Sequence, residues 1–458
     1  MLVELARAVR ERRVSPVELV EESLRRIDRL GPPINAVVRV HADEALAAAR
    51  AMADGDDAGR SGPLAGLPLL VKDMARCAGS VTTFGSPLFA DAPPDTVDDA
   101  TVGKLRAAGA IVVGRTNTPA FGHTAFTDNR VFGPTRNPWN LTRSPAGSSG
   151  GSAAALIAGL APLATTSDGG GSTRGPASAC GLVGYKPTNG AYGRNVLPRW
   201  IAFSTMGSAG RTVADVAQEV AVSIGGVPGD VLSFPRGTVD LTWRRPARVV
   251  AVPGYRGGMA AVVAEAFERT CATIERAVGI PVERVEQVFS GDTATAWFTI
   301  SSAELAQSLA DVRDQWAEFE PTLQFACDYG AAVTAFDYVA AQRARFTAAA
   351  ELDALLGDDT VLVVPTFNSE SWPAEGPLPL AAGPVTGPGV AFNTTEGNFT
   401  GHPAISVPMG YDTAGVPLGV QVVAPRFADG LAFGLAAALE EAMPWATVAP
   451  GYDPWHVP

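Results

Sequence analysis

Six short apolar runs, separated by helix-like stretches, constrain the fold of this chain more than any other feature of its sequence. The runs have the length and β-branched content of buried strands, and they are Pro68–Val71, Ala110–Val113, Arg248–Val252, Thr360–Val364, Ala404–Val407 and Leu418–Val423. Apolar residues follow helical spacing between several of these runs, over Ser152–Gly159, Met259–Ala277 and Phe427–Met443. Strands that alternate with helices indicate an α/β fold, in which helices cover a mixed or parallel sheet.

The N-terminal part of the chain predicts a helix that starts at Ser15. This serine is a suitable N-cap, Pro16 suits the first helical position, and Glu18 completes a capping box. The chain has no tandem repeat, and no linker rich in Gly, Ser or Pro clearly divides it. We therefore expect a single domain over 1–458, with a helical region over about 1–60, a catalytic core over about 62–225, a variable region that shapes the substrate pocket over about 230–380, and a return to the core over about 390–445.

The composition favours a soluble protein and argues against binding of nucleic acid or membranes. Hydrophobic residues make up 47% of the 458 residues, and the net charge is −12, which does not suit contact with nucleic acid or anionic lipid. The four cysteines include no CxxC pair, so buried, reduced thiols are favoured over a zinc site or a disulfide framework. The N-terminus lacks a signal-peptide pattern, and no apolar run reaches the ~20 residues that span a bilayer, so we expect a cytoplasmic protein.

A glycine-rich turn that ends in a serine is the strongest candidate for a reactive site. The glycines of Gly169–Ser172 allow a tight turn that brings backbone N–H groups close to a substrate carbonyl, and such donors stabilise the oxyanion of acyl transfer. The Ser172 hydroxyl needs a neighbouring base. Lys72, which follows an apolar run, can serve as that base if burial keeps it neutral. Ser148 can then pass the proton between them.

Neither serine segment specifies this chemistry alone, because Gly/Ser-rich turns are common in loops and a lysine near a strand end is usually solvated. The segment Gly147–Gly151 also fits the G-x-S-x-G elbow of α/β-hydrolases, which would make Ser149 the nucleophile. That elbow needs a strand before it and a histidine after it. The preceding residues do not suit a strand, and only His402 and His456 follow. The joint pattern of the lysine and both serine segments is more specific.

The sequence around these residues resembles the amidase signature family. The matching motifs are Gly62–Pro68, Phe132–Trp139, Cys180–Thr188, Gly401–Pro408 and Gly415–Pro425. The resemblance spans roughly residues 13–445 and is densest over 62–190. It implies the amidase signature fold, a large mixed central β-sheet covered on both sides by helices. It also implies an amidohydrolase that cleaves a carboxamide C–N bond without a metal or cofactor.

The resemblance assigns roles to individual residues. It implies that Ser172 forms the acyl-enzyme, that Ser148 is the cis-serine that relays the proton, and that Lys72 is the base. The other residues that it implies are the oxyanion donors Gly169, Gly170, Gly171 and Ser172, the bracing pair Asp168 and Arg174, and Gly122, His123 and Thr124 near the substrate. The family usually has Thr or Ile at the position of Gly169 and Ile at that of Thr173. Neither departure removes a catalytic group.

Other functions remain open at this stage. The family also supplies the glutaminase subunit of a tRNA-dependent amidotransferase, and a purely binding protein is compatible with the composition. The expected partner is a small-molecule amide, with an apolar or aromatic acyl group favoured, and the resemblance suggests a homodimer. Five aromatic side chains suit either the core or the pocket wall, and we expect core positions for Phe84, Trp139, Trp200, Phe203 and Trp297.

Overall fold

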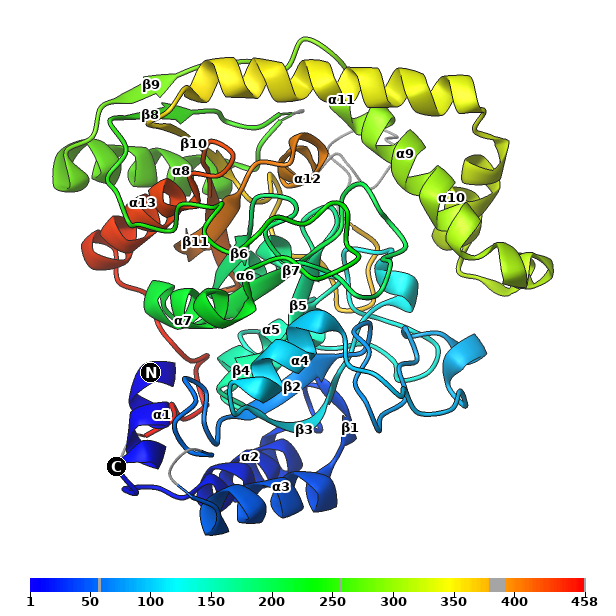
Figure 1. Ribbon diagram of the computed structural model, residues 1–458. Helices are drawn as coiled ribbons and strands as arrows, with labels where there is room; N and C mark the ends of the chain where they lie inside the picture. Colours follow the sequence, from blue (N-terminus) through cyan, green and yellow to red (C-terminus); the bar gives the residue numbers. More distant parts are fainter. Residues whose placement is uncertain (57–58, 256–257, 379–391, 457–458) are drawn as a thin grey trace.

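The computed structural model describes residues 1–458 apart from 57–58, 256–257, 379–391 and 457–458 (Figure 1). Its strands are β1 (Val37–Val40), β2 (Pro68–Lys72), β3 (Ile111–Thr116), β4 (Leu163–Ala164), β5 (Thr166–Asp168), β6 (Val183–Lys186), β7 (Thr205–Gly210), β8 (Arg248–Ala251), β9 (Val282–Arg284), β10 (Thr360–Pro365), β11 (Ala404–Tyr411) and β12 (Pro417–Val423). Its α-helices are α1 (Leu2–Arg10), α2 (Pro16–Leu30), α3 (Ala42–Asp54), α4 (Ala100–Ala107), α5 (Gly150–Ile157), α6 (Arg174–Cys180), α7 (Val213–Ser223), α8 (Ala261–Thr273), α9 (Thr293–Ser308), α10 (Pro321–Ala332), α11 (Ala335–Leu356), α12 (Thr395–Thr400) and α13 (Asp429–Ala442).

An eight-stranded sheet runs through the centre of the described chain, in the order β5-β7-β6-β11-β12-β10-β8-β9 (Figure 1). The sheet is mixed. Along this order, each neighbouring pair from β5 through β10 is antiparallel, whereas the β10–β8 and β8–β9 pairs are parallel. Strand β10 shows how both faces are covered. Val361 and Val363 pack in the cluster that includes α7, α8 and α13, and Leu362 and Val364 pack in the cluster that includes α9 and α11. The predicted α/β fold with a helix-covered mixed sheet is confirmed.

A second sheet of four strands, in the order β1-β3-β2-β4, lies beside the first. Two of the six predicted strands, Pro68–Val71 and Ala110–Val113, belong to this smaller sheet as β2 and β3. All residues of β2 are buried, and it pairs in parallel with β3 on one side and β4 on the other. The strand therefore delivers its last residue, Lys72, into the protein interior.

The predicted N-terminal helix is present as α2, with its capping box formed. The Glu18 amide donates to Ser15 Oγ at 3.0 Å, and the Ser15 amide donates to Glu18 Oε2 at 2.7 Å. The helix packs against α3 and the small sheet, at the lower edge of Figure 1. Across the described residues, no helix combines the length and apolar composition needed to cross a bilayer.

Candidate active site

Lys72, at the end of β2, lies at the centre of a cluster of serine hydroxyls. Its side chain is 1% exposed. Its Nζ lies 2.7 Å from Ser148 Oγ, 2.9 Å from Ser149 Oγ and 2.9 Å from Ser167 Oγ. An ammonium donates to all three hydroxyls, whereas a neutral amine keeps one lone pair that accepts a proton from one of them. The sequence suggested the contact with Ser148, considered Ser149 only as the nucleophile of the alternative elbow, and gave no role to Ser167.

Burial makes the neutral amine accessible at ordinary pH. Desolvation lowers the pKa of Lys72 to about 7, against a smaller opposing effect of the Asp168 charge. The neutral form is therefore well populated at neutral pH, as a general base requires.

Ser148 is positioned by a tightly packed turn that only glycine permits. The Gly147–Ser148 peptide bond is cis. A Cβ on Gly147 would lie 2.7 Å from the Thr124 carbonyl oxygen. A Cβ on Gly122, where φ is +71°, would lie 2.7 Å from the Met74 side chain and 3.2 Å from Ser148 Oγ. The glycine at 122 therefore keeps the space beside the Ser148 hydroxyl open.

The turn that carries Ser172 is held by a fully buried ion pair. Arg174 Nη2 and Asp168 Oδ1 are 2.9 Å apart, and both side chains are 0% exposed. Burial alone would raise the pKa of Asp168, but the Arg174 guanidinium, together with Lys186 and Asn398, outweighs it and holds that pKa well below its usual range. The carboxylate also accepts from the Gly171 amide at 2.7 Å and from the Thr173 amide at 3.2 Å.

These contacts change the expected set of oxyanion donors. Because the Gly171 amide already donates to Asp168, it is not free to bind a substrate oxygen in this geometry. The amides of Gly169, Gly170 and Ser172 remain as candidates. The glycines are also needed for packing, since a Cβ on Gly169 would lie 2.5 Å from the Trp200 ring and one on Gly170 would lie 2.8 Å from the Trp297 ring.

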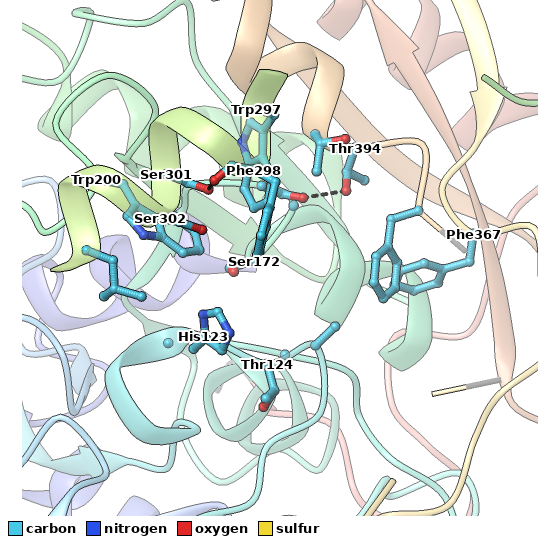
Figure 2. A pocket seen from close by; sticks show the side chains of 18 residues that line it. His123, Thr124, Ser172, Trp200, Trp297, Phe298, Ser301, Ser302, Phe367 and Thr394 are labelled. Carbon is cyan, nitrogen blue, oxygen red and sulfur yellow. Dashed lines mark hydrogen bonds between the residues drawn. The ribbon is translucent and has the colours of Figure 1, made fainter. Parts of the chain in front are cut away.

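Ser172 lies where two cavities meet. The first cavity is drawn in Figure 2, where Ser172 lies between His123 and Thr124 on one side and Trp297 and nearby residues of α9 on the other. The second cavity is lined by Lys72, Ser148 and Ser172, among others. Within the described residues, the Ser172 hydroxyl makes no side-chain hydrogen bond. It is therefore available to a substrate from either cavity.

The first cavity is apolar and lacks charged groups. The described residues that line it include no Asp, Glu, Lys or Arg. Burial lowers the pKa of His123 to about 4, against a smaller effect of the Thr322 carbonyl, so this imidazole is neutral at neutral pH. His123, Thr124 and Gly122 all line the cavity, as the sequence suggested.

The positions of the aromatic side chains differ in part from the core positions that the sequence predicted. Trp200 and Trp297 line the first cavity, and Phe84 lines the second, although core positions were predicted for all of them. Trp297 is nevertheless a buried member of a hydrophobic cluster, as predicted, and Trp200 and Phe84 are partly buried and pack against such clusters. The prediction was right for Phe203, which is fully buried, whereas Trp139 is half-buried and packs against another cluster; both line neither cavity.

Several lining residues carried no sequence signal. They come from α9, from the segment after β10 and from the N-terminal end of α12, and they are Phe298, Ser301, Ser302, Leu305, Phe367, Thr394 and Thr395. The Thr394 hydroxyl donates to the Gly170 carbonyl oxygen at 2.7 Å (Figure 2). These segments lie more than a hundred residues from the reactive turn in sequence, so only the tertiary fold brings them to it.

The nucleophile-elbow interpretation is wrong for this fold. No strand precedes Ser149 between residues 117 and 149. Ser149 is 0% exposed, and its hydroxyl contacts Lys72. His402 instead contacts Asp353 at 3.0 Å and lines neither cavity. No three His, Cys, Asp or Glu side chains among the described residues are grouped so as to hold a metal ion.

Comparison with known proteins identifies the family. The amidase family model matches residues 18–432. This chain belongs to the amidase signature family. The amidase is 33% identical to an acylamidase of Rhodococcus erythropolis, over 98% of this chain and 96% of the relative. It is 34% identical to a glutamyl-tRNA(Gln) amidotransferase subunit of Acidothermus cellulolyticus, over 96% of this chain and 94% of the relative.

Solved structures agree with this assignment. A bacterial aryl acylamidase of the amidase signature family superposes on the amidase with a TM-score of 0.88 at 28% identity, and 96% of each chain is covered. A 6-aminohexanoate cyclic dimer hydrolase in complex with its substrate gives a TM-score of 0.85 at 28% identity, and 98% of each chain is covered. The amidase is therefore a hydrolase of C–N bonds that acts on amides.

Proposed function

We propose that this amidase cleaves carboxamides through an acyl-enzyme on Ser172, with Ser148 as proton relay and Lys72 as base. The observation that carries the proposal is the contact of a buried lysine of lowered pKa with Ser148, in the cavity that also exposes Ser172. A neutral Lys72 accepts the Ser148 proton, Ser148 accepts that of Ser172, and the Ser172 oxygen attacks the carbonyl carbon. No histidine is required at any step.

The later steps use the same groups in reverse. The amides of Gly169, Gly170 and Ser172 bind the negative oxygen of the tetrahedral intermediate. The protonated relay then delivers a proton to the departing nitrogen, and the C–N bond breaks to leave an ester on Ser172. Water, deprotonated by the same relay, hydrolyses this ester to a carboxylic acid. Asp168 and Arg174 hold the turn so that these donors stay fixed.

The position of the relay orients the substrate. The leaving nitrogen must receive its proton from Ser148, so we place the amine in the second cavity, beside Ser148 and Lys72. The acyl group then extends into the first cavity, between α9 and the segment around His123. This arrangement supports a substrate-shaping role for the region over 230–380, to which α9 belongs.

The lining of the first cavity favours an apolar acyl group over glutamine. Glutamine carries an ammonium and a carboxylate on its acyl side, and burying them without partners is costly. Trp200, Trp297 and Phe298 offer apolar and aromatic contact, and the described lining offers no charge to pair with either group. A glutaminase role in a tRNA-dependent amidotransferase is therefore the weaker candidate, despite the 34% identity to such a protein.

The acyl preference is tested with a series of 4-nitroanilides. Since a buried CH₂ contributes about 0.8 kcal/mol, we expect kcat/KM for the hexanoyl compound to exceed that for the acetyl compound by about 10-fold or more. L-Glutamine should release ammonia no faster than buffer alone. Glutamine turnover that exceeds anilide turnover would instead support the amidotransferase role.

The pH dependence follows from the pKa of the base. Lys72 is active only when neutral and its pKa is lowered to about 7, so protonation below that value removes activity. We expect kcat/KM to fall tenfold per pH unit well below 7 and to level off above it. A profile that is flat from about pH 5 to 9 would contradict a lysine base, and an inflection near pH 4 would point to His123.

A further inference from the structure

The second cavity contains more positive charge than the proposed reaction needs. Arg76, Arg194 and Arg199 line it in addition to Lys72, and Asp99 is the one carboxylate among its described lining residues. Three guanidinium groups are not required for proton relay. Their surroundings show which of them is free to bind a ligand.

Two of these arginines already have acidic neighbours. Arg194 lies 3.6 Å from Asp230, and Arg76 lies 4.0 Å from Asp95. Asp99 is also close enough to interact with both, because the charges of Arg76 and Arg194 each lower the pKa of Asp99. These two side chains are therefore largely neutralised within the protein.

Arg199 differs from them because no described carboxylate pairs with it. Its guanidinium lies over the Phe84 ring at 4.3 Å and the Phe121 ring at 4.8 Å. Its buried Nε has no hydrogen-bond partner within the described part of the chain. Burial, reinforced by the like charge of Arg76, lowers its pKa to about 10, so the group is still a cation at neutral pH.

The two phenyl rings hold this guanidinium by cation–π contact, and its Nε has no partner among the described residues. A guanidinium held in this way is suited to bidentate binding of a carboxylate. The relay orients the amine half of the substrate into this same cavity. Arg199 would therefore contact an anionic group on the amine half of the substrate, and not one on the acyl half.

We propose that Arg199 binds a carboxylate on the leaving amine, so that the preferred substrates are N-acyl derivatives of amino acids or aminobenzoates. The substrate class rests on the proposed amidase function, whereas the anion site itself does not. Arg199 selects the substrate, and hydrolysis proceeds as described above: the departing nitrogen takes one proton from the relay, and the amino acid or aminobenzoate leaves with a free amino group.

The kinetic test compares three anilides under identical conditions. They are 4-(hexanoylamino)benzoate, its neutral analogue 4-(hexanoylamino)benzamide, and adipic acid monoanilide, which carries its carboxylate on the acyl half. Because a hydrogen bond to a charged group is among the stronger ones, we expect kcat/KM for the benzoate to exceed that for the benzamide by about 10- to 100-fold. In Arg199→Met the ratio should fall to near 1, while Arg25→Met, which removes an exposed charge on α2, should keep it.

A binding test separates this proposal from the amidase proposal. Ser172→Ala protein is titrated with 4-aminobenzoate by calorimetry, alongside the Ser172→Ala/Arg199→Met double variant, with circular dichroism to verify folding. We expect the double variant to bind 4-aminobenzoate at least tenfold more weakly than Ser172→Ala. This result would support the anion site even if wild type hydrolysed none of the three anilides, an outcome that would reject only the amidase proposal. Equal binding by both proteins, no binding by either, an unchanged ratio in Arg199→Met, or a preference for adipic acid monoanilide would each overturn the inference.

Discussion

Replacement of Ser172 by alanine is expected to lower kcat by about 10⁵-fold or more while the protein stays folded. Removal of the nucleophile of a serine hydrolase has an effect of this order, because the remaining groups have no acceptor for the acyl group. Ser172 is half-buried at the junction of the two cavities, so loss of its hydroxyl leaves no packing defect. The measurement is turnover of hexanoyl 4-nitroanilide, with thermal unfolding as the check on folding.

Two serine variants serve as controls for this experiment. Ser290→Ala removes an exposed hydroxyl that donates to Glu351 and lines neither cavity, so it should retain wild-type turnover. Ser149→Ala removes one partner of Lys72 and should reduce turnover far less than Ser172→Ala. Retained activity in Ser172→Ala would show that the acyl group is carried elsewhere.

Replacement of Lys72 by methionine is expected to lower kcat by about 10²- to 10⁴-fold, the usual contribution of a general base. Methionine has a similar length and removes a buried amine, so the effect should be on catalysis more than on folding. The inflection near pH 7 should disappear with the lysine. The measurement is the full pH profile of kcat/KM for wild type and variant.

Lys186 provides a matched control, because it is a second buried lysine. Burial, reinforced by the charge of Arg174, lowers its pKa to about 7 as well. It contacts the Pro187 carbonyl oxygen and Asn189, and it lines neither cavity. Lys186→Met should therefore keep the inflection near pH 7. If the inflection disappeared in Lys186→Met and persisted in Lys72→Met, the base would be Lys186 and not Lys72.

The sequence predicted six strands that carry apolar runs and missed others, and glycine explains two of the misses, β6 and β7. Strand β6 carries Gly184 where α6 packs against it, and β7 carries Gly207 beside Thr173, the residue before α6. A Cβ on Gly184 would lie 2.4 Å from Ala177 Cβ, and one on Gly207 would lie 2.3 Å from Thr173 Oγ1. Close helix–sheet contact therefore required small residues, and these weakened the alternating pattern by which strands are recognised.

The reactive groups were predictable because they are local, and the walls around them were not. Lys72 ends an apolar run, and Ser172 follows a glycine turn, so each carries its own signal. By contrast, Trp297 contacts the reactive turn only because α9 crosses over Gly170. The hydrogen bond from the Gly171 amide to Asp168 likewise forms only because the turn folds back toward the end of β5. Such features arise from packing between distant segments.

The most direct test of the central claim is intact-protein mass spectrometry after treatment with a fluorophosphonate probe for activated serines. Wild type, Ser172→Ala and Lys72→Met are compared at pH 8, where Lys72 is largely neutral. We expect a single adduct on wild type, none on Ser172→Ala and much slower labelling of Lys72→Met. An adduct that persists in Ser172→Ala, or labelling that does not depend on Lys72, would contradict the central claim.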